Sequence, residues 1–289
     1  MSDKLQVQVD SALLPFLFSQ LPQWSRSKIK QRLQSGCVSV NQTIVTQHDF
    51  ALHPGDSITV SATSSSSTNA KSHTSVPLEI LYSDRDLIAI NKPAGLLSVG
   101  TTKETQNHAL AILRKQLSRR SQPVQLWPVH RIDRDTSGVL LFATSRAIRE
   151  TVMSTWETAD KKYLAIVKGN PNPPAGTINE PLRLDEHEYR MHVGAHPDAK
   201  PAVTHYRTEE YTAQRSLLNV TLETGRQHQI RAHLSWLGYP IIGDMRYGIA
   251  GPRMGLHALS LSISKPGSRE ILHFETPAPA DFLNLMRLI

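Results

Sequence analysis

The sequence predicts an α+β fold built around a mixed or antiparallel sheet, and three observations lead to this prediction. Strand-like apolar runs outnumber helical ones through most of the 289 residues. The helical segments are few and irregularly spaced, whereas a doubly wound parallel sheet alternates strands with helices regularly. A segment rich in Ser and Thr at residues 62–76 buries little apolar surface and is expected to be a flexible linker. It separates a small unit at residues 1–61 from a large unit at residues 77–289.

The small unit is expected to be a compact α/β unit of two helices followed by short strands. An apolar run at Leu13–Leu21 predicts the first helix. Ser25 can cap a second helix over Arg26–Gln34, which should end at Gly36. Strands are expected at Cys37–Val40, Thr43–Val45 and Ser57–Val60, with turns at Asn41-Gln42 and Pro54-Gly55-Asp56.

The second helix of the small unit is basic. Arg26 and Lys30 share one face, and Lys28 and Arg32 share the neighbouring face, because each pair is four residues apart. No acidic residue lies between them, so the helix favours contact with the phosphates of RNA. The net charge of +7 for the whole chain also suits a polyanionic partner.

The residues around this helix resemble the small RNA-binding domain called S-four-type after a ribosomal protein. The matching segments are Ser25-Arg26-Ser27-Lys28, Gly36–Asn41 and Leu52–Asp56, within residues 8–61. The resemblance implies that the basic helix holds the phosphates of folded RNA.

The large unit alternates strand-like runs with a few helices. Strands are expected at Leu78–Tyr82, Leu87–Ile90, Val139–Ala143, Tyr163–Val167, Val203–Arg207 and Leu217–Leu222. Helices are expected at Ala109–Ser118, from Ser145 to about Glu157, and at Gln227–Leu237. In the last helix Ile230, Leu234 and Leu237 have the spacing of a buried face.

The densest polar segment runs from His130 to Gly138, directly before the strand at Val139–Ala143. A polar loop held by a rigid strand is a common place for catalytic groups. Two carboxylates, Asp133 and Asp135, invite comparison with a glycoside hydrolase. However, two residues so close on one loop rarely oppose each other across a sugar, and Asp135 is expected to be a turn residue.

Three further segments combine charged groups with turns or helix starts: Asn91–Gly95, Lys161–Gly169 and Thr224–Leu234. At the start of the last one, backbone N–H groups and Arg226 are expected to form a phosphate cradle. His228 and His233 lie in the same helix, but the spacing lacks the glutamate of a zinc motif, so no metal is expected.

Together with Gly238–Gly248 and the C-terminal segment from Leu256 to Phe282, these segments resemble the RluA family of RNA pseudouridine synthases. The similarity runs from about residue 78 to residue 289 in the expected order. An S-four-type domain joined by a linker is also seen in several members. The resemblance therefore implies a pseudouridine synthase domain that needs no cofactor and isomerises uridine in RNA.

The same resemblance implies roles for individual residues. Asp133 corresponds to the catalytic aspartate, and Arg131 to the arginine that opens the base stack. Tyr163 corresponds to the aromatic residue that packs on the everted uracil. Either Arg231 or Arg226 is expected to pair with the aspartate. Further substrate contacts are expected from His130, Thr136, Gln229, Ile230 and Lys92, besides the four cations of the basic helix.

Composition limits the remaining possibilities. Cys37 is the only cysteine, so a disulfide within the chain is excluded. No apolar run is long enough to span a membrane, and a cytoplasmic monomer is expected. The basic helix favours large-subunit ribosomal RNA as substrate. The alternatives are the same chemistry on transfer RNA and a non-catalytic RNA-binding factor for ribosome assembly.

Overall fold

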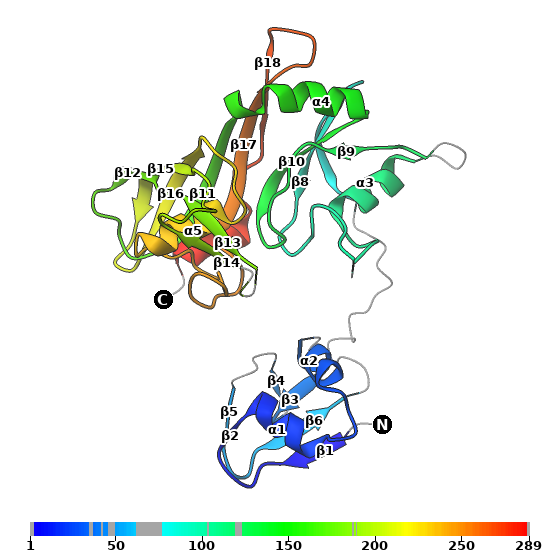
Figure 1. Cartoon of the computed structure of the whole chain (residues 1–289), viewed down its shortest axis with the longest axis vertical. Coiled ribbons are helices and arrows are strands. Elements are labelled where there is room, and N and C mark those ends of the chain that lie inside the picture. The colour runs from blue at the N-terminus through cyan, green and yellow to red at the C-terminus, as the bar shows by residue number, and fades with distance from the viewer. Residues whose placement is uncertain are drawn as a thin grey trace. The chain divides into compact units, whose positions relative to one another are not determined.

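Figure 1 shows the computed structural model, which describes residues 3–34, 37–41, 43–45, 50–61, 77–102, 104–118, 123–186, 188 and 190–287. The chain forms two compact units, Met1–Val76 and Pro77–Ile289. The expected linker at residues 62–76 lies outside the described residues, as do Gly36 and Gln42. In the described ranges no helix is long and apolar enough to cross a membrane.

The small unit contains a four-stranded antiparallel sheet and two helices. The strand order is β1 (Asp3–Gln6), β6 (Ser57–Val60), β3 (Val38–Val40) and β4 (Thr43–Ile44). A separate pair joins β2 (Ser11–Ala12) to β5 (Ala51–Leu52). The helices α1 (Leu13–Gln20) and α2 (Arg26–Gln34) lie where the sequence predicts them. The hydroxyl of Ser25 accepts the Lys28 N–H at 3.3 Å and so caps α2 as expected.

The core of the small unit explains which face of α2 is turned outward. Ile29 and Leu33 of α2 are buried and belong to the same hydrophobic cluster as Leu13 and Leu17 of α1. Because these apolar residues occupy the inner face, Arg26, Lys28 and Lys30 are exposed on the outer side. Arg32 is half-buried and donates to the Ser61 carbonyl at 3.2 Å.

The large unit is a ten-stranded mixed sheet. Eight strands follow the order β12 (Ala175–Asn179), β15 (Val203–Tyr211), β16 (Arg215–Leu222), β11 (Asp160–Lys168), β17 (Leu256–Ser264), β10 (Ser137–Ala143), β8 (Leu87–Lys92) and β7 (Glu79–Ser83). Two more strands, β18 (Ile271–Glu275) and β9 (Trp127–Pro128), pair with β17 and β10. Among the described strand pairs only β10 and β17 run parallel. The predicted α+β class with a mixed sheet is therefore confirmed.

Helices cover both faces of the sheet. On the β8–β10 half, α3 (Ala109–Leu117) packs against Leu140 and Phe142, while α4 (Arg146–Ser154) packs against Val139 and Leu141. Alternate residues of a strand point to opposite faces, so these two helices lie on opposite sides of β10. This explains why all seven residues of β10 are buried.

The other half of the sheet is covered in the same way. Ile230 and Leu234 of α5 (Gln229–Trp236) pack with Ala165 and Val167 of β11. Phe282 of α6 (Ala280–Leu283) packs with Ile166, which points to the other face. Figure 1 shows β17, in orange, between the two halves of the sheet. A hairpin of β13 (Leu182–Asp185) and β14 (Arg190–Val193) lies outside this sheet.

Two helix boundaries differ from the prediction by more than one residue, for local reasons. α5 begins at Gln229 rather than Gln227, because His228 has a left-handed backbone conformation with φ of +51°. α4 ends at Ser154, and a short 3-10 helix at Trp156–Thr158 takes the place of its expected last turn. The helix starts one residue after the expected Ser145, which instead caps it, since the Ser145 hydroxyl accepts the Ile148 N–H at 3.2 Å.

Candidate active site

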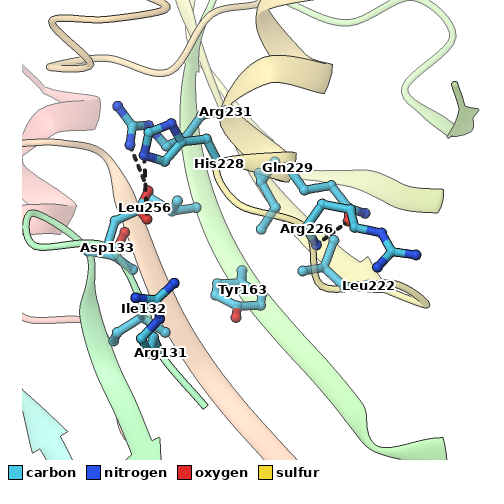
Figure 2. A pocket seen from close by; sticks show the side chains of 12 residues that line it. Arg131, Ile132, Asp133, Tyr163, Leu222, Arg226, His228, Gln229, Arg231 and Leu256 are labelled. Carbon is cyan, nitrogen blue, oxygen red and sulfur yellow. Dashed lines mark hydrogen bonds and ion pairs between the residues drawn. The ribbon is translucent and has the colours of Figure 1, made fainter. Parts of the chain in front are cut away.

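A pocket lies between the loop that precedes β10, the strand β11 and the start of α5. Segments far apart in the sequence meet here, and eight of the residues predicted for the site line the pocket together. They are Arg131, Asp133, Thr136, Tyr163, Arg226, Gln229, Ile230 and Arg231. The four further lining residues are Ile132, Leu222, His228 and Leu256. Figure 2 shows this pocket.

The loop that carries Asp133 is fixed at its C-terminal end. The Thr136 N–H donates to the Asp133 carbonyl at 3.2 Å and closes a turn. Gly138 then pairs with Ala258 of the parallel strand β17 at φ of +115°. A Cβ atom on Gly138 would lie 2.1 Å from the Ala258 carbonyl oxygen, so only glycine permits this approach. The close pairing of β10 with β17 therefore sets where the loop ends.

The buried side chain of Lys92 holds the same loop in place through hydrogen bonds. Its side chain is fully buried, and its ammonium donates to the carbonyls of Pro93, Leu96 and Arg134 at 3.0, 2.7 and 2.9 Å. Burial lowers the pKa of Lys92 to about 7, against the opposing charges of Asp135 and Asp133. Lys92 was expected to contact the substrate, but its ammonium already donates to three backbone carbonyls. Lys92 instead holds the Asp133 loop.

An arginine between two carboxylates forms the electrostatic centre of the pocket. Arg231 donates from Nη1 to Asp133 Oδ2 at 2.6 Å, and from Nε and Nη2 to the two Asp244 oxygens at 2.7 and 2.9 Å. Burial works against the charge of Arg231, but the Asp244 and Asp133 carboxylates outweigh it and raise its pKa. Burial likewise opposes the charge of Asp244, whose pKa is nevertheless lowered by Arg231. Asp244 thus fixes the guanidinium in the orientation that meets Asp133.

These contacts decide between the two arginines expected to pair with Asp133. Arg231 makes the contact, whereas Arg226 donates from Nε to the Pro201 carbonyl at 3.0 Å. Arg226 remains at the pocket as a lining residue.

His228 is a second neighbour of Asp133. Its Nε2 lies 3.8 Å from Asp133 Oδ1, and its Nδ1 lies 3.0 Å from the hydroxyl of Tyr247. The Tyr247 oxygen accepts the Met191 N–H at 2.7 Å, so its own proton is available for Nδ1. Burial lowers the pKa of His228, although Asp133 opposes this shift. The arrangement favours a neutral imidazole with its proton on Nε2, facing the carboxylate.

Tyr163 provides the aromatic surface of the pocket. Figure 2 shows its ring projecting from β11 into the pocket that also holds Asp133. Burial and the nearby charge of Asp133 raise the pKa of its hydroxyl, so Tyr163 is a neutral phenol. A half-buried, uncharged ring that lines the pocket is suited to stacking on a base.

His130 and Gln229 are engaged by the protein itself. His130 Nε2 accepts the Leu141 N–H at 3.2 Å, and burial lowers the pKa of His130 to about 4. Gln229 is 2% exposed and donates to Val203 and Thr204. Its carbonyl oxygen accepts from the Thr224 hydroxyl at 2.8 Å and from the Arg226 N–H at 2.9 Å.

The contacts of Gln229 leave fewer free polar groups at the start of α5 than expected. Its amide is saturated by four hydrogen bonds, so its placement does not agree with the expected substrate contact. The expected phosphate cradle has one donor fewer, because the Arg226 N–H donates to the Gln229 side chain. Gln229 instead ties the start of α5 to β15, through Val203 and Thr204.

Thr136 and Ile230 fit the roles expected of them more closely. The Thr136 side chain is buried, and among the described residues its hydroxyl has no hydrogen-bond partner. The hydroxyl oxygen itself is covered, although Thr136 lines the pocket as expected. Ile230 is buried and lines the pocket with an apolar surface. Arg131 is exposed and lines both this pocket and the larger cleft beside it.

The predicted cations of the small unit lie on α2. Lys28 and Arg32 lie over the ring of Trp24, at 4.2 and 5.8 Å from its centroid, and Arg26 lies 5.3 Å from the centroid of Phe18. Lys30 is exposed. The outer face of α2 therefore combines cations with aromatic rings, as nucleic-acid-binding surfaces often do.

Three residues of the site were missed in the sequence: His228, Asp244 and Tyr247. His228 and Arg231 are three residues apart, a spacing that places two helical side chains on one face, and this signal was available. Asp244 and Tyr247 belong to the segment Gly238–Gly248, but nothing local in that segment indicates an arginine partner. His233, which was also considered, is buried and bonded to Thr204 and Glu180. In the described part of the chain, no cluster of His, Cys, Asp and Glu could hold a metal ion.

Comparison with known proteins identifies the family. A family model described as RNA pseudouridylate synthase matches residues 86–236. This chain belongs to that family. A model of the S4 domain matches residues 13–58, so an S4 domain precedes the pseudouridine synthase domain. Both resemblances seen in the sequence are thereby confirmed, and the protein is an RNA pseudouridine synthase.

Relatives match nearly the whole synthase. An uncharacterized RNA pseudouridine synthase of Bacillus subtilis is 33% identical over 283 residues, covering 94% of this chain and 91% of the relative. Ribosomal large subunit pseudouridine synthase D of Nitrosomonas europaea is 34% identical over 298 residues, covering 98% and 84%. The solved structure of human RNA pseudouridylate synthase domain containing 4 is 27% identical, with a TM-score of 0.60, and covers 72% of this chain and 92% of that chain.

Proposed function

We propose that this synthase converts uridine to pseudouridine in large-subunit ribosomal RNA, with Asp133 as the catalytic carboxylate. The observation that carries the proposal is the contact of 2.6 Å between Asp133 and Arg231 at the pocket. This charge-assisted hydrogen bond holds the carboxylate in a fixed orientation. The choice of RNA is supported by relatives in Nitrosomonas europaea and Haemophilus ducreyi that are named ribosomal large subunit pseudouridine synthase D.

The reaction asks little of the protein beyond a carboxylate and a shaped pocket. The bond between N1 of uracil and C1′ of ribose breaks, the base turns, and C5 joins C1′. A proton leaves C5 and another is taken up at N1, so no electrons are gained or lost and no redox cofactor is required. An ionised Asp133 can attack C1′, add to the uracil ring or remove a proton from the ribose.

The surrounding residues are assigned to binding of the everted base. Everting a nucleotide costs a few kcal/mol, and stacking on Tyr163 returns about 1–3 kcal/mol. Arg131 fills the gap that the base leaves in the RNA. Thr136 lines the pocket beside the base, and Ile230 forms the apolar wall. Arg226 contacts RNA at the rim of the pocket.

The S4 domain is assigned to RNA outside the pocket. We propose that residues 1–61 form this domain, that residues 62–76 are the linker and that residues 77–289 form the catalytic domain. The cations Arg26, Lys28, Lys30 and Arg32 would contact phosphates of folded RNA. We propose a cytoplasmic monomer, without metal or cofactor, as the working form.

Two measurements test these assignments separately. The Asp133→Asn variant should bind RNA with unchanged affinity but form no pseudouridine. The matched control Asp135→Asn, two residues away with a half-exposed carboxylate, should keep activity. An active Asp133→Asn variant would refute the catalytic role. Mapping pseudouridine in cells with and without the gene tests the target, and loss from transfer RNA alone would overturn the ribosomal assignment.

A further inference from the structure

A larger cleft continues from the uridine pocket. Its volume is about 730 Å³, and it shares Arg131, Asp133 and Tyr163 with the pocket. Cavities of roughly 300–1,000 Å³ commonly hold small ligands. Beyond the shared residues the cleft has a basic and aromatic lining, made by His130, Arg134, Arg149, Trp156 and Lys161. Asp133 is the one acidic residue among the described lining residues, and Arg231 already pairs with it.

Lys161 is the unusual member of this lining. It lies on β11 two residues before Tyr163, and alternate residues of a strand share a face, so both side chains face the cleft. Only 7% of Lys161 is exposed. Its ammonium lies 5.8 Å from the centroid of the Trp156 ring. Among the described residues no acceptor forms a hydrogen bond or an ion pair with it, and the adjacent Asp160 pairs with Lys162 instead.

The side chain of Lys161 is largely covered by the protein, whereas its ammonium remains accessible from the cleft, where it can meet an anion. Burial lowers the pKa of Lys161, although Asp160 and Glu157 oppose this shift. Its neighbour His130 adds no negative charge. Since Nε2 of that ring accepts the Leu141 N–H, the proton of the neutral imidazole lies on Nδ1, and His130 offers a second donor. Among the described residues, no carboxylate pairs with Lys161 or His130 in the cleft. This part of the cleft is therefore open to an anionic ligand.

We propose that Lys161 binds a phosphodiester of the RNA next to the everted uridine, and that the cleft holds the adjoining nucleotide. The inference rests on the proposed function, because it takes RNA as the occupant of the neighbouring pocket. An everted uridine is bonded to two phosphates, and the open side of its pocket leads into this cleft. The phosphodiester is therefore the anion that every substrate brings to Lys161, whatever its sequence.

The test compares Lys161→Met with Lys161→Arg and with the control Lys162→Met. Lys162 is the next residue on the strand, points to the other face and is half exposed. Turnover is measured by tritium release from total RNA labelled with [5-³H]uridine, taken from cells that lack the protein. RNA binding is measured over a series of salt concentrations, and thermal unfolding is measured without RNA.

Lys161→Met should raise KM about tenfold with little change in kcat, since one hydrogen bond to a charged group is lost. The slope of log affinity against log salt should fall in magnitude by about 0.7 to 0.9, the value of one phosphate contact. The unfolding midpoint should stay the same or rise, because the variant loses no ion pair among the described residues and removes the desolvation of a largely covered cation. Lys161→Arg should restore KM and the slope, and Lys162→Met should match the wild type.

The inference is overturned if Lys161→Met keeps the wild-type KM and salt slope, or if kcat falls while KM is unchanged. A lower unfolding midpoint, or failure to fold, would mean that Lys161 is structural and would also overturn it. The salt slope separates this inference from the proposed function. If the wild type releases no tritium from any RNA, the proposed function fails, while the slope of Lys161→Met still decides on the phosphate site.

Discussion

The uridine pocket and helix α2 both present cations, but in opposite environments. Arg231 lines the pocket and is 9% exposed between two carboxylates, and Lys92, which holds the Asp133 loop, is fully buried against three carbonyls. On α2, Arg26 and Lys28 are exposed and rest on the aromatic faces of Phe18 and Trp24.

This difference separates two uses of positive charge. A buried cation with assigned partners fixes the position of other groups, and removing a partner leaves an uncompensated charge. An exposed cation attracts a polyanion through its charge, is screened by salt and contributes little to folding. Substitutions that remove a partner of a buried cation should therefore reduce stability as well as turnover, whereas substitutions of the exposed cations of α2 should weaken RNA binding alone.

The largest effect is expected at Asp244. Asp244→Asn removes the carboxylate that accepts two hydrogen bonds from Arg231, and should lower the free energy of unfolding by about 3–5 kcal/mol. Turnover should also fall, because the guanidinium is no longer held toward Asp133. Chemical denaturation and tritium release measure the two effects.

The control for Asp244 is Asp160→Asn. Asp160 pairs with Lys162 at 3.4 Å with its side chain half exposed, so its loss should cost less than about 1 kcal/mol. If both variants lose the same free energy of unfolding, the buried pair contributes no more to stability than the exposed pair. Burial would then not distinguish the two groups of cations.

A smaller effect, dependent on pH, is expected from His130. Burial lowers its pKa from the ordinary value of 6.5 to about 4. As the pH falls below 6.5, the unfolded chain takes up a proton that the folded protein does not. Stability should therefore decrease between pH 6.5 and pH 4, by about 3 kcal/mol from this residue, and level off below pH 4.

His130→Gln isolates this contribution, because glutamine keeps an acceptor for the Leu141 N–H but does not titrate. Denaturation of both proteins between pH 4 and pH 7 gives the difference. Parallel stability curves would show that His130 is not held neutral in the folded protein.

At His228 the expected loss is in turnover rather than in stability. His228→Gly should reduce turnover by about tenfold to a hundredfold, because the N–H that faces Asp133 is lost. The free energy of unfolding should change by less than about 1 kcal/mol, since glycine accepts the left-handed φ of +51° without strain. The turnover of His228→Asn should lie between those of the wild type and His228→Gly, because asparagine tolerates this backbone conformation and keeps an N–H. Wild-type turnover in His228→Gly would leave His228 without a role at the site.

The parts of the fold that local signals specify could be predicted from the sequence. The apolar runs of α1 and β8 and the cap at Ser25 are properties of neighbouring residues. The polar segment from His130 to Gly138 could likewise be identified as a site, because its density beside a buried strand is a local property. The roles of Asp133, Tyr163 and Arg231 were predicted from the resemblance to the RluA family, whose motifs occur in this chain in the expected order.

Contacts between distant segments could not be predicted in the same way. The strand β17 alternates serine with apolar residues, and its position between β11 and β10 depends on pairing rather than on composition. Lys92 and Gln229 were expected to meet substrate because their groups are polar, yet burial directs them to carbonyls and hydroxyls of the protein. Asp244 is found only once the fold brings it to Arg231.

The smallest effect on stability is expected on α2. Lys30→Gln should change the free energy of unfolding by less than about 0.5 kcal/mol, because the exposed side chain makes no contact that the fold needs. It should nevertheless reduce the salt slope of RNA binding by about 0.7 to 0.9. The control Lys115→Gln, on the exposed side of α3, should change neither quantity. If Lys30→Gln instead destabilises the protein and leaves the salt slope unchanged, α2 serves the fold rather than RNA, and the contrast between the two groups of cations disappears.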